Sequence, residues 1–410
     1  MDEEVDMYIE REIQATLQRF MKQFKVVLVT GARQTGKTTL LKHVLGNEFN
    51  YVTLDDFNEL NNALNSPSTF ITDSTLPIFV DEVQLAPSLF RQIKLVVDKS
   101  ELKGMVILTG SQSFSLMQGV SESLAGRVGI LELSSLSLRE IVGSSTKEAF
   151  VPKVNNKNQT ENNNGNFDIW SHICRGSMPR LQDSQVERDV FYSSYVRTYL
   201  ERDVRQLINL KDETKFYNFL VAMAARTGQL LNASDVADTV GASVKTVQDW
   251  ISVLEASDII HVLQPFWSNS DKRLTKSPKI YFLDTGLACY LTGWDTAKQL
   301  QRGAMNGHMF ETFVVSEILK SHKNAGKDLR NIFFYRDKDK REIDLVVKRG
   351  HYLHPVEIKV SGNVGSDAVK NFDLLGKFSD YEVGFGTVVC QTGSPYYINE
   401  NVQAISVFDI

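Results

Sequence analysis

Short, uninterrupted apolar runs alternate with amphipathic stretches through the first part of the chain. The runs at residues 26–29 and 78–80 are too short for helices. Runs of this kind are typical of strands that are buried on both faces of a parallel sheet. Residues 5–24 and 88–100 instead carry apolar side chains at helical spacing. The pattern predicts an α/β domain with a parallel sheet at residues 1–142.

The turn after the first apolar run has the pattern of a phosphate-binding loop. Its sequence, GARQTGKT, follows a predicted strand and leads into a predicted helix, which is the setting that G-x-x-x-x-G-K-[ST] requires. The two glycines let successive N–H groups turn toward an anion, and the helix N-terminus adds unpaired donors. Lys37 is expected to reach the β- and γ-phosphates of a nucleoside triphosphate, and the Thr38 hydroxyl to bind Mg²⁺. The predicted nucleotide contacts are Gly31, Ala32, Arg33, Gln34, Thr35, Gly36, Lys37, Thr38 and Thr39.

Polar side chains that suit triphosphate hydrolysis follow two later strands. Asp81 and Glu82 close the apolar run that begins at Leu76, and open α/β sheets bind ligands where their strands end. Asp81 is predicted to hold Mg²⁺, and Glu82 to polarise the attacking water. Thr109, at the end of the next strand, is a candidate sensor of the γ-phosphate, with a capped loop as the alternative. Arg127 is a candidate transition-state cation, in cis or toward a neighbouring subunit, or an ordinary surface arginine.

The segments GARQTGKTT, LPIFVDEVQ, ILTGSQSF and SLAGR together resemble the AAA+-type ATPases of bacteria and archaea that carry a C-terminal domain of unknown function. The resemblance implies ATP as the nucleotide, Arg127 as a finger and a strand-end polar group as the sensor. The family's Pro-Leu-Ser-Phe-x-Glu box stands here as SLSLRE at residues 135–140. The segment KSPKIYFLDTGLA at 276–288 resembles the second half of the same family, so the resemblance extends over nearly the whole chain.

Residues 143–166 interrupt this pattern with an Asn-rich segment. Seven of the twelve residues from 155 to 166 are asparagine, and such a composition cannot bury enough apolar area to offset the entropy of ordering. A flexible insertion is therefore predicted at 143–166. The amphipathic segments that follow, at 167–227, are predicted to form a helical lid.

Residues 228–295 have the pattern of a winged helix: two helices joined by a turn, and then two strands. Ser234 is the predicted N-cap of the first helix, and residues 244–254 form the second helix, in the recognition position. The segment between the strands is basic and ends at Lys279. Either this unit binds double-stranded DNA or it packs against protein. The predicted DNA contacts are Lys245, Gln248, Lys272, Arg273 and Lys276.

Residues 300–410 resemble the PD-(D/E)xK core of restriction-endonuclease-like α/β domains, in which a helix is followed by three strands. Glu357 and Lys359 share one face of an extended strand, and Asp344 on the neighbouring strand can meet Glu357. The two carboxylates would bind Mg²⁺ or Mn²⁺, Lys359 would hold the attacking water, and Glu311 on the helix would orient the metal. The alternative is a non-catalytic domain with residual charged pairs.

Composition limits the other possibilities. The net charge of −5 and the pI of about 5.9 argue against a uniformly basic surface but leave room for a local basic patch. Three distant cysteines predict neither a disulfide framework nor a zinc site and are typical of a reducing cytoplasm. No secretory signal or membrane span is expected.

The whole chain is therefore predicted to be a cytoplasmic ATPase, which forms a homo-oligomer or acts alone. Its predicted action is on DNA, through a winged helix and a metal-dependent nuclease-like domain. The alternative is an ATP-gated remodelling or interaction switch whose C-terminal domain is non-catalytic.

Overall fold

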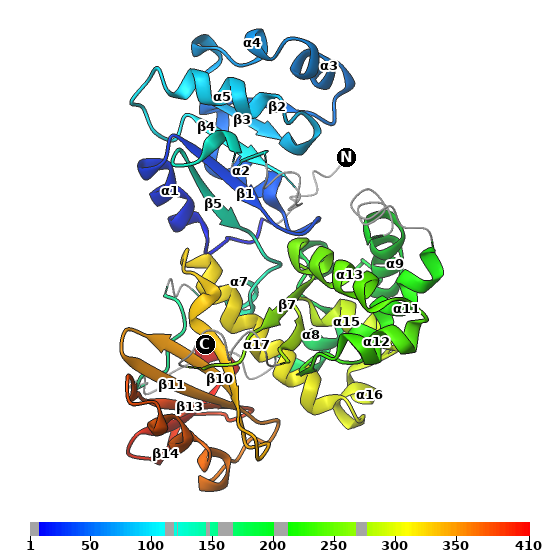
Figure 1. The fold of residues 1–410 in the computed structure, drawn as a ribbon, viewed down its shortest axis with the longest axis vertical. Coiled ribbons are helices and arrows are strands. Elements are labelled where there is room, and N and C mark those ends of the chain that lie inside the picture. Colours follow the sequence, from blue (N-terminus) through cyan, green and yellow to red (C-terminus); the bar gives the residue numbers. More distant parts are fainter. Residues whose placement is uncertain are drawn as a thin grey trace.

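The computed structural model describes residues 8–110, 119–120, 122–144, 148–154, 167–200, 212–267 and 277–410. A parallel five-stranded sheet lies at one end of the molecule, and its strand order is β2-β3-β4-β1-β5 (Figure 1). The predicted α/β domain with a parallel sheet is confirmed. Its strands are β1 (Val26–Thr30), β2 (Asn50–Thr53), β3 (Ile78–Asp81), β4 (Val106–Thr109) and β5 (Val128–Glu132).

Helices cover both faces of this sheet, which explains why its central strands are apolar throughout. Val27 and Val29 of β1 pack with buried side chains of α1 (Gln14–Gln23) and α2 (Lys37–Leu45). Val26 and Leu28 point to the other face, where α3 (Phe57–Asn65) and α5 (Leu89–Val97) contribute to a second apolar cluster. Because side chains alternate along a strand, both faces need apolar residues. This sandwich fixes the carboxyl ends of the strands, where the phosphate loop begins.

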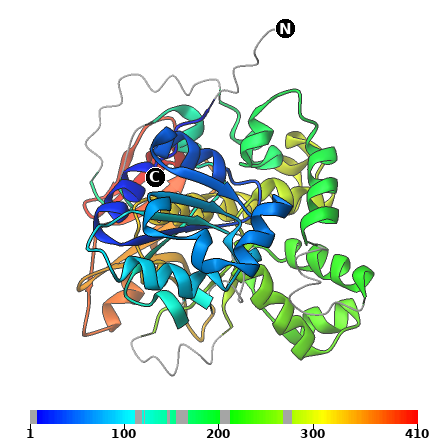
Figure 2. The same cartoon turned by 90° about the horizontal axis from the view of Figure 1, so that it is seen from above.

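A mostly helical unit lies to one side of the sheet, in green in Figures 1 and 2. Its small antiparallel sheet has the order β6-β8-β7. The carboxylate of buried Asp284 links several parts of this helical unit. It caps the helix Thr285–Thr292 by accepting a hydrogen bond from Leu287 N–H (2.9 Å). It also accepts hydrogen bonds from Ser177 N–H (2.7 Å) and from the Tyr192 hydroxyl. The elements are α8 (Ile169–Arg175), α9 (Arg188–Tyr195), a π-helical turn (Val196–Leu200), α11 (Glu213–Ala224), β6 (Gln229–Leu230), α12 (Ala233–Val240), α13 (Val244–Ala256), β7 (Ile260–Leu263), β8 (Lys279–Phe282), α15 (Thr285–Thr292) and α16 (Ala297–Arg302).

Helix α12 begins two residues earlier than a cap at Ser234 would allow. The side chain of Asn232, not Ser234, accepts hydrogen bonds from the backbone N–H groups of Ser234 and Asp235. The N-cap prediction at Ser234 is therefore wrong. Asn is as good a cap as Ser, because its side-chain oxygen reaches the same two orphan donors.

The C-terminal region, in orange and red in Figure 1, is built on a sheet with the order β14-β15-β13-β11-β10-β9. Two 3₁₀ segments lie in this region, Ser366–Val369 and Phe372–Lys377. The region begins with the long helix α17 (Asn306–Asn324). Its strands are β9 (Ile332–Arg336), β10 (Glu342–Arg349), β11 (Tyr352–Ile358), β12 (Glu382–Val383), β13 (Gly386–Cys390), β14 (Tyr396–Asn399) and β15 (Val402–Ser406).

The helical unit and the C-terminal sheet are continuous. The chain just after β7 pairs with β9, through Phe266 N–H to Phe334 O (2.6 Å) and Phe334 N–H to Gln264 O (3.2 Å). One buried apolar cluster runs from α8 through α17 to β15. The predicted boundary between 228–295 and 300–410 thus separates two pieces of sequence that share one core.

The Asn-rich segment also differs from its prediction. Phe150, within the predicted flexible insertion 143–166, is 7% exposed. Its N–H donates to the Ser321 hydroxyl (3.0 Å), and its carbonyl lies 2.8 Å from His322 Nε2, both on α17. The prediction of a flexible insertion is therefore wrong for the neighbourhood of Phe150, whose aromatic ring supplies buried apolar area. Residues 155–166 lie outside the described residues.

Candidate functional sites

The phosphate loop has a conformation that depends on its glycines. Gly31 has φ +140°, and a Cβ there would lie 2.1 Å from the carbonyl oxygen of Leu133, which follows β5. Gly36, the last residue before α2, has φ +88°. Both values disfavour residues with a Cβ. The loop is further fixed by the Thr35 hydroxyl, which donates to Ala32 O (2.9 Å).

Lys37 lies inside this loop. Its Nζ donates to the carbonyl oxygens of Gly31 (3.1 Å) and Ala32 (2.9 Å). Burial lowers the pKa of Lys37, and the nearby carboxylates of Glu82 and Asp81 oppose that shift. The ammonium is thus held by the loop's own backbone, in the place from which a P-loop lysine reaches phosphate oxygens.

Thr38, at the start of α2, meets Asp81 and Thr109 at the carboxyl ends of β3 and β4. The Thr38 hydroxyl lies 3.0 Å from both Asp81 carboxylate oxygens, and the Thr109 hydroxyl donates to Asp81 Oδ1. Asp81 is only 6% exposed. A hydroxyl beside a buried carboxylate is a hard oxygen donor set that suits Mg²⁺, so these residues fit the metal of a nucleotide–Mg²⁺ complex.

Glu82 follows β3 in a left-handed conformation, with φ +57°. Its N–H donates to Thr109 Oγ1 (3.2 Å), and its carboxylate accepts a hydrogen bond from the Gln84 amide. A non-glycine residue at positive φ is uncommon and is found where a site fixes a side chain. Thr109 therefore joins Asp81, the predicted metal ligand, to the backbone of the predicted base.

Two residues that contact this site, Tyr51 and Arg11, were not predicted from the sequence. The Tyr51 hydroxyl, on β2, lies 3.3 Å from Asp81 Oδ2, and Lys42 Nζ lies 4.1 Å from the centre of the Tyr51 ring. Arg11, before α1, donates to Thr35 O from Nη1 and to Ser134 O from Nη2, each at 2.8 Å.

Arg11 is held in turn by the segment SLSLRE. Its Nε lies 3.1 Å from Glu140 Oε1. Glu140 also completes a capping box with Ser137 at the start of α7 (Leu138–Val142). A buried glutamate needs a cationic partner, and Arg11 is that partner for Glu140. The sequence signal that could have pointed to Glu140 is the Ser137–Glu140 capping-box pattern. The segment therefore braces the phosphate loop through one arginine.

Arg127 lies away from the phosphate loop of its own chain. It precedes β5, whose start pairs with the start of β1, whereas the loop follows the other end of β1. Its guanidinium is exposed and binds Asp98, with Nε–Oδ1 at 2.6 Å and Nη2–Oδ2 at 2.9 Å. It therefore does not reach the loop in cis, and a role toward a neighbouring subunit stays a prediction.

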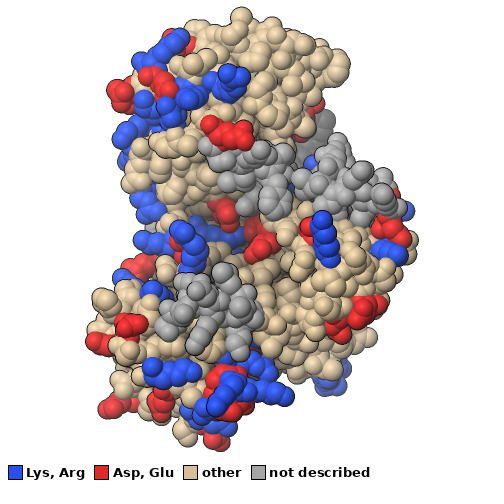
Figure 3. Space-filling view, in the orientation of Figure 1, with Lys and Arg blue, Asp and Glu red and all other residues tan. Residues whose placement is uncertain are grey.

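The predicted DNA contacts fall into two groups. Lys245 and Gln248 are exposed on α13, whereas Lys272, Arg273 and Lys276 lie outside the described residues. Lys279 was expected to extend the basic segment, and that expectation is wrong because Lys279 is 3% exposed. Acidic and basic side chains are intermixed over the face drawn in Figure 3.

The C-terminal strands bring the predicted carboxylates together. Leu345 of β10 pairs with Val356 of β11, so Asp344 and Glu357 lie opposite each other at the next position. Asp344 Oδ2 accepts a bond from Ile358 N–H (2.8 Å), and Lys359 Nζ lies 2.6 Å from Glu357 Oε1. Asp344, Glu357 and Lys359 thus form one cluster.

Burial dominates the electrostatics of this pair. Desolvation raises the pKa of Asp344 to about 7, and the nearby Glu311 carboxylate adds to the shift. Desolvation and the neighbouring Asp344 raise the pKa of Glu357 to about 7, against the effect of Lys359. Glu357 Oε2 is buried without a hydrogen-bond partner. Two adjacent buried carboxylates of this kind are poorly compensated by the protein alone.

Glu311 is engaged elsewhere in the cluster. Its Oε1 lies 2.9 Å from Lys279 Nζ and 2.7 Å from the Tyr281 hydroxyl, both on β8. Within the described residues, no group of three or more His, Cys, Asp or Glu side chains is arranged to hold a metal ion. The pair Asp344–Glu357 would therefore have to hold a cation with water as the other ligands, which is a common arrangement for Mg²⁺.

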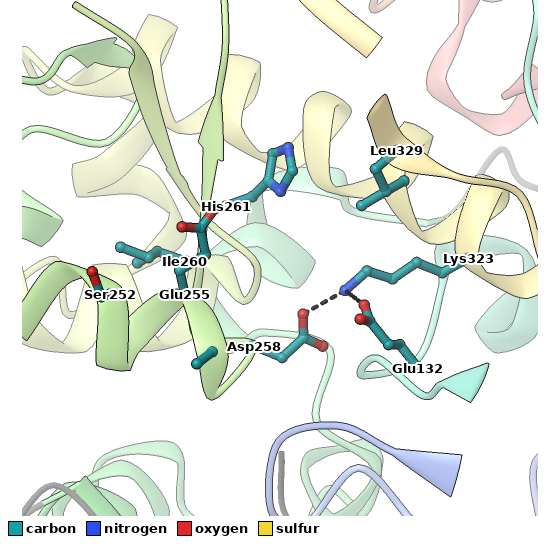
Figure 4. Close-up of a pocket in the computed structure, with 9 residues that line it drawn as sticks. Glu132, Ser252, Glu255, Asp258, Ile260, His261, Lys323 and Leu329 are labelled. Carbon is teal, nitrogen blue, oxygen red and sulfur yellow. Dashed lines mark hydrogen bonds and ion pairs between the residues drawn. The ribbon is translucent and has the colours of Figure 1, made fainter. Parts of the chain in front are cut away.

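A pocket of about 370 Å³ lies where the three parts of the chain meet, between β5, the end of α13 and the end of α17. Lys323 of α17 crosses it to bind Asp258 and Glu132, the latter at 3.2 Å (Figure 4). Burial alone would lower the pKa of Lys323. The carboxylates of Asp258 and Glu132 together have the larger effect and raise the pKa above its usual value, so the lysine stays charged. This triad ties the C-terminal region to the edge of the nucleotide domain.

Family models match three stretches of the chain. A family model described as an AAA domain matches residues 23–142, and two described as domains of unknown function match 166–298 and 306–410. Uncharacterised proteins of Mycobacterium bovis and Mycobacterium tuberculosis are each 30% identical over 357 residues, covering 86% of this chain and 74% of the relative. A Walker-type ATPase of Pyrococcus abyssi has a TM-score of 0.46 and 13% identity over 70% of this chain and 97% of that one. Among the described residues, no helix is long and apolar enough to cross a membrane.

Proposed function

The chain belongs to the same family as the two mycobacterial proteins, with a P-loop ATPase domain at its N-terminal end, and on this premise we propose that it hydrolyses ATP. The observation that carries the proposal is the joint position of Lys37, Thr38, Asp81 and Glu82 around one loop. Lys37 would contact the β- and γ-phosphates, and Thr38 and Asp81 would hold the Mg²⁺ that neutralises them. The proximity of these four residues to one loop supports a nucleotide–Mg²⁺ site there.

Glu82 supplies the remaining step. Its carboxylate would orient a water molecule and accept its proton as the water oxygen bonds to the γ-phosphorus and the bridging oxygen leaves with ADP. Thr109 would fix the position of the Glu82 backbone relative to the Asp81 carboxylate, because its hydroxyl hydrogen-bonds to both. The products are ADP and phosphate.

Binding of a fluorescent ATP analogue with Mg²⁺ to Lys37→Ala tests the nucleotide site. We expect binding to fall by more than about 100-fold, because charge-assisted contacts to phosphate are among the strongest hydrogen bonds. Lys22→Ala is the matched control: Lys22 is an exposed lysine on α1, and its variant should bind ATP. Unchanged affinity of Lys37→Ala would refute the proposed site.

The proposal extends to the C-terminal region: a PD-(D/E)xK-like site at Asp344, Glu357 and Lys359 that binds Mg²⁺ or Mn²⁺ and cleaves phosphodiester bonds in DNA. Supporting it are the opposed carboxylates, the unpartnered Glu357 Oε2 and the adjacent Lys359 ammonium. Bound metal would polarise a phosphate oxygen, and Lys359 would hold the attacking water.

Cleavage of linear and supercoiled DNA with Mg²⁺ or Mn²⁺, with and without ATP, tests this extension. Wild-type protein should cut, and both Asp344→Ala and Lys359→Ala should not. Asp373→Ala, an exposed acid on the same region, is the control and should cut normally. Absence of metal-dependent cleavage by wild type in every nucleotide state would sink the nuclease proposal.

The alternative is an ATP-gated remodelling or interaction switch whose C-terminal region is non-catalytic. The contacts of Glu311 favour this alternative. Glu311 pairs with Lys279 and Tyr281 rather than pointing toward the Asp344–Glu357 pair. The contacts of α17 with the nucleotide domain would then transmit nucleotide state. ATP-dependent change in proteolytic fragments, without DNA cleavage, would favour this function.

DNA contact is proposed through a winged helix formed by α12, α13 and the β7–β8 hairpin. The two helices joined at Gly241 and the following antiparallel pair support it, and Lys245 and Gln248 are exposed on the second helix. Lys272, Arg273 and Lys276 of the connecting segment would contact phosphates. Anisotropy titration with duplex DNA should give weaker, less salt-dependent binding for Lys245→Ala.

A further inference from the structure

A lysine from the helical unit lies among the C-terminal carboxylates. Lys279 Nζ is 2.9 Å from Glu311 Oε1 and 2.5 Å from Glu342 Oε1, and its side chain is 4% exposed. Tyr281, two residues further on β8, donates to the same Glu311 oxygen at 2.7 Å. Because residues two apart on a strand share a face, β8 presents both groups to α17 and β10. The cluster is therefore built by two parts of the chain.

The four carboxylates of the cluster form two pairs, Glu311 with Glu342 and Asp344 with Glu357. Lys279 neutralises Glu311 and Glu342, and Glu342 also binds Arg336 at 2.8 Å. The other pair, Asp344 and Glu357, has Lys359 on Glu357 Oε1. Glu357 is 8% exposed and its Oε2 has no hydrogen-bond partner. The oxygen that lacks a partner thus belongs to the second pair.

We infer that Lys279 is a built-in cation that occupies one of two cation positions in the cluster, so that the C-terminal site takes a single divalent metal ion, between Asp344 and Glu357. The inference deepens the proposed metal site and rests on it. An ammonium at 2.5–2.9 Å from two carboxylate oxygens stands where a divalent ion would otherwise be held by them.

The charge state of Lys279 agrees with this role. Burial lowers the pKa of Lys279, but Tyr281 and the carboxylates of Glu311, Asp344 and Glu342 raise it well above its usual value. The ammonium is therefore kept protonated. A metal ion that entered between Glu311 and Glu342 would have to expel it into an apolar core, where an unpaired ammonium is strongly disfavoured.

Counting bound Mn²⁺ by electron paramagnetic resonance of the free ion tests the inference. The full-length chain is titrated without nucleotide, in an Asp81→Asn background that removes the metal ligand of the ATP site. The parent should bind one Mn²⁺ and Lys279→Met two. Lys348→Met is the matched control, because Lys348 lies on β10 of the same region but its Nζ contacts the Tyr381 hydroxyl (3.1 Å) rather than a pair of carboxylates; it should bind one.

A second pair of variants keeps the test decisive if Lys279→Met fails to fold. Glu311→Gln should keep the single Mn²⁺ within about twofold of the parent affinity, whereas Glu357→Gln should weaken it at least tenfold. One ion in both parent and Lys279→Met, or a tenfold loss in Glu311→Gln, would overturn the role of Lys279. No Mn²⁺ in the parent would instead remove the proposed metal site, and the inference with it.

Discussion

Single residues decide whether the phosphate loop can form. Gly31→Ala would place a methyl group 2.1 Å from Leu133 O at φ +140°. We expect this variant to lose about 1–3 kcal/mol of stability and most ATP affinity, because backbone strain of this kind costs that much. Thermal unfolding and ATP titration measure both quantities. Gly46→Ala is the control: its φ is +54° with open space around the added methyl, so ATP affinity should persist. Normal ATP binding by Gly31→Ala would contradict the role given to the close approach.

Thr109 is predicted to act on hydrolysis rather than on binding. Thr109→Val keeps the shape but removes the hydroxyl that contacts Asp81 and the Glu82 N–H. Steady-state turnover should fall about 10–100-fold, as for other groups that orient metal ligands, while ATP affinity changes little. Thr53→Val, at the end of β2 and two strands away from β4, serves as control, because that hydroxyl accepts from Asp55 N–H. Full turnover by Thr109→Val would leave the capped-loop alternative.

At the scale of elements, the order of helices and strands was largely predictable, whereas the contacts between distant segments were not. Apolar runs and the GARQTGKT turn locate β1, β3, β4 and α2, because a doubly covered parallel sheet leaves an unambiguous pattern. The same pattern could not predict that residues 264–266 extend β7 to pair with β9, since that contact depends on tertiary packing.

The candidate site divides in the same way. Motif residues such as Lys37 and Asp81 were predicted from spacing along the chain. Arg11 and Tyr51 were missed because each reaches the site from a distant element with no motif of its own. Lys279 looked like part of a basic surface, and its burial follows from three-dimensional packing of β8 against α17.

Helix α8 carries a buried histidine that makes stability pH-dependent. Burial, with Lys320 nearby, lowers the pKa of His172 from its usual 6.5 to about 3. Below pH 6.5 the unfolded chain therefore binds a proton that the folded protein does not. The free energy of unfolding decreases as the pH is lowered. At pH 5 this amounts to about 2 kcal/mol. Thermal unfolding at pH 7 and pH 5 should show a smaller loss for His172→Gln than for wild type, and equal losses would contradict the assignment.

On the scale of the whole molecule, the Lys323 triad holds the C-terminal region against the nucleotide domain. Lys323→Met leaves buried Asp258 without its cation, which should cost about 3–5 kcal/mol. Differential scanning calorimetry should show a lowered unfolding temperature. Lys153→Met is the control, because both partners of its ion pair with Glu148 are exposed and the pair should contribute little. A stability loss no larger than that of the control would argue against the triad as a link.

Assembly of several copies of the chain would give Arg127 a catalytic role, because this residue lies away from the phosphate loop of its own chain and would act only at the ATP site of a neighbouring subunit. Its exposed position at the far edge of the sheet leaves it accessible to another subunit. Mixing Arg127→Ala with Glu82→Gln protein asks whether turnover is recovered. Recovery requires that one subunit supply the arginine and the other the glutamate, whereas mixtures no more active than their components would leave Arg127 as a surface residue.

The central claim is that Glu82 drives hydrolysis at a site that Lys37, Thr38 and Asp81 assemble. The most direct measurement is a single-turnover experiment in which excess protein binds radiolabelled ATP with Mg²⁺ and released phosphate is followed. Wild type should convert the bound ATP, and Glu82→Gln should bind it equally well and convert it at least about 100-fold more slowly. Hydrolysis by Glu82→Gln at the wild-type rate would contradict the account.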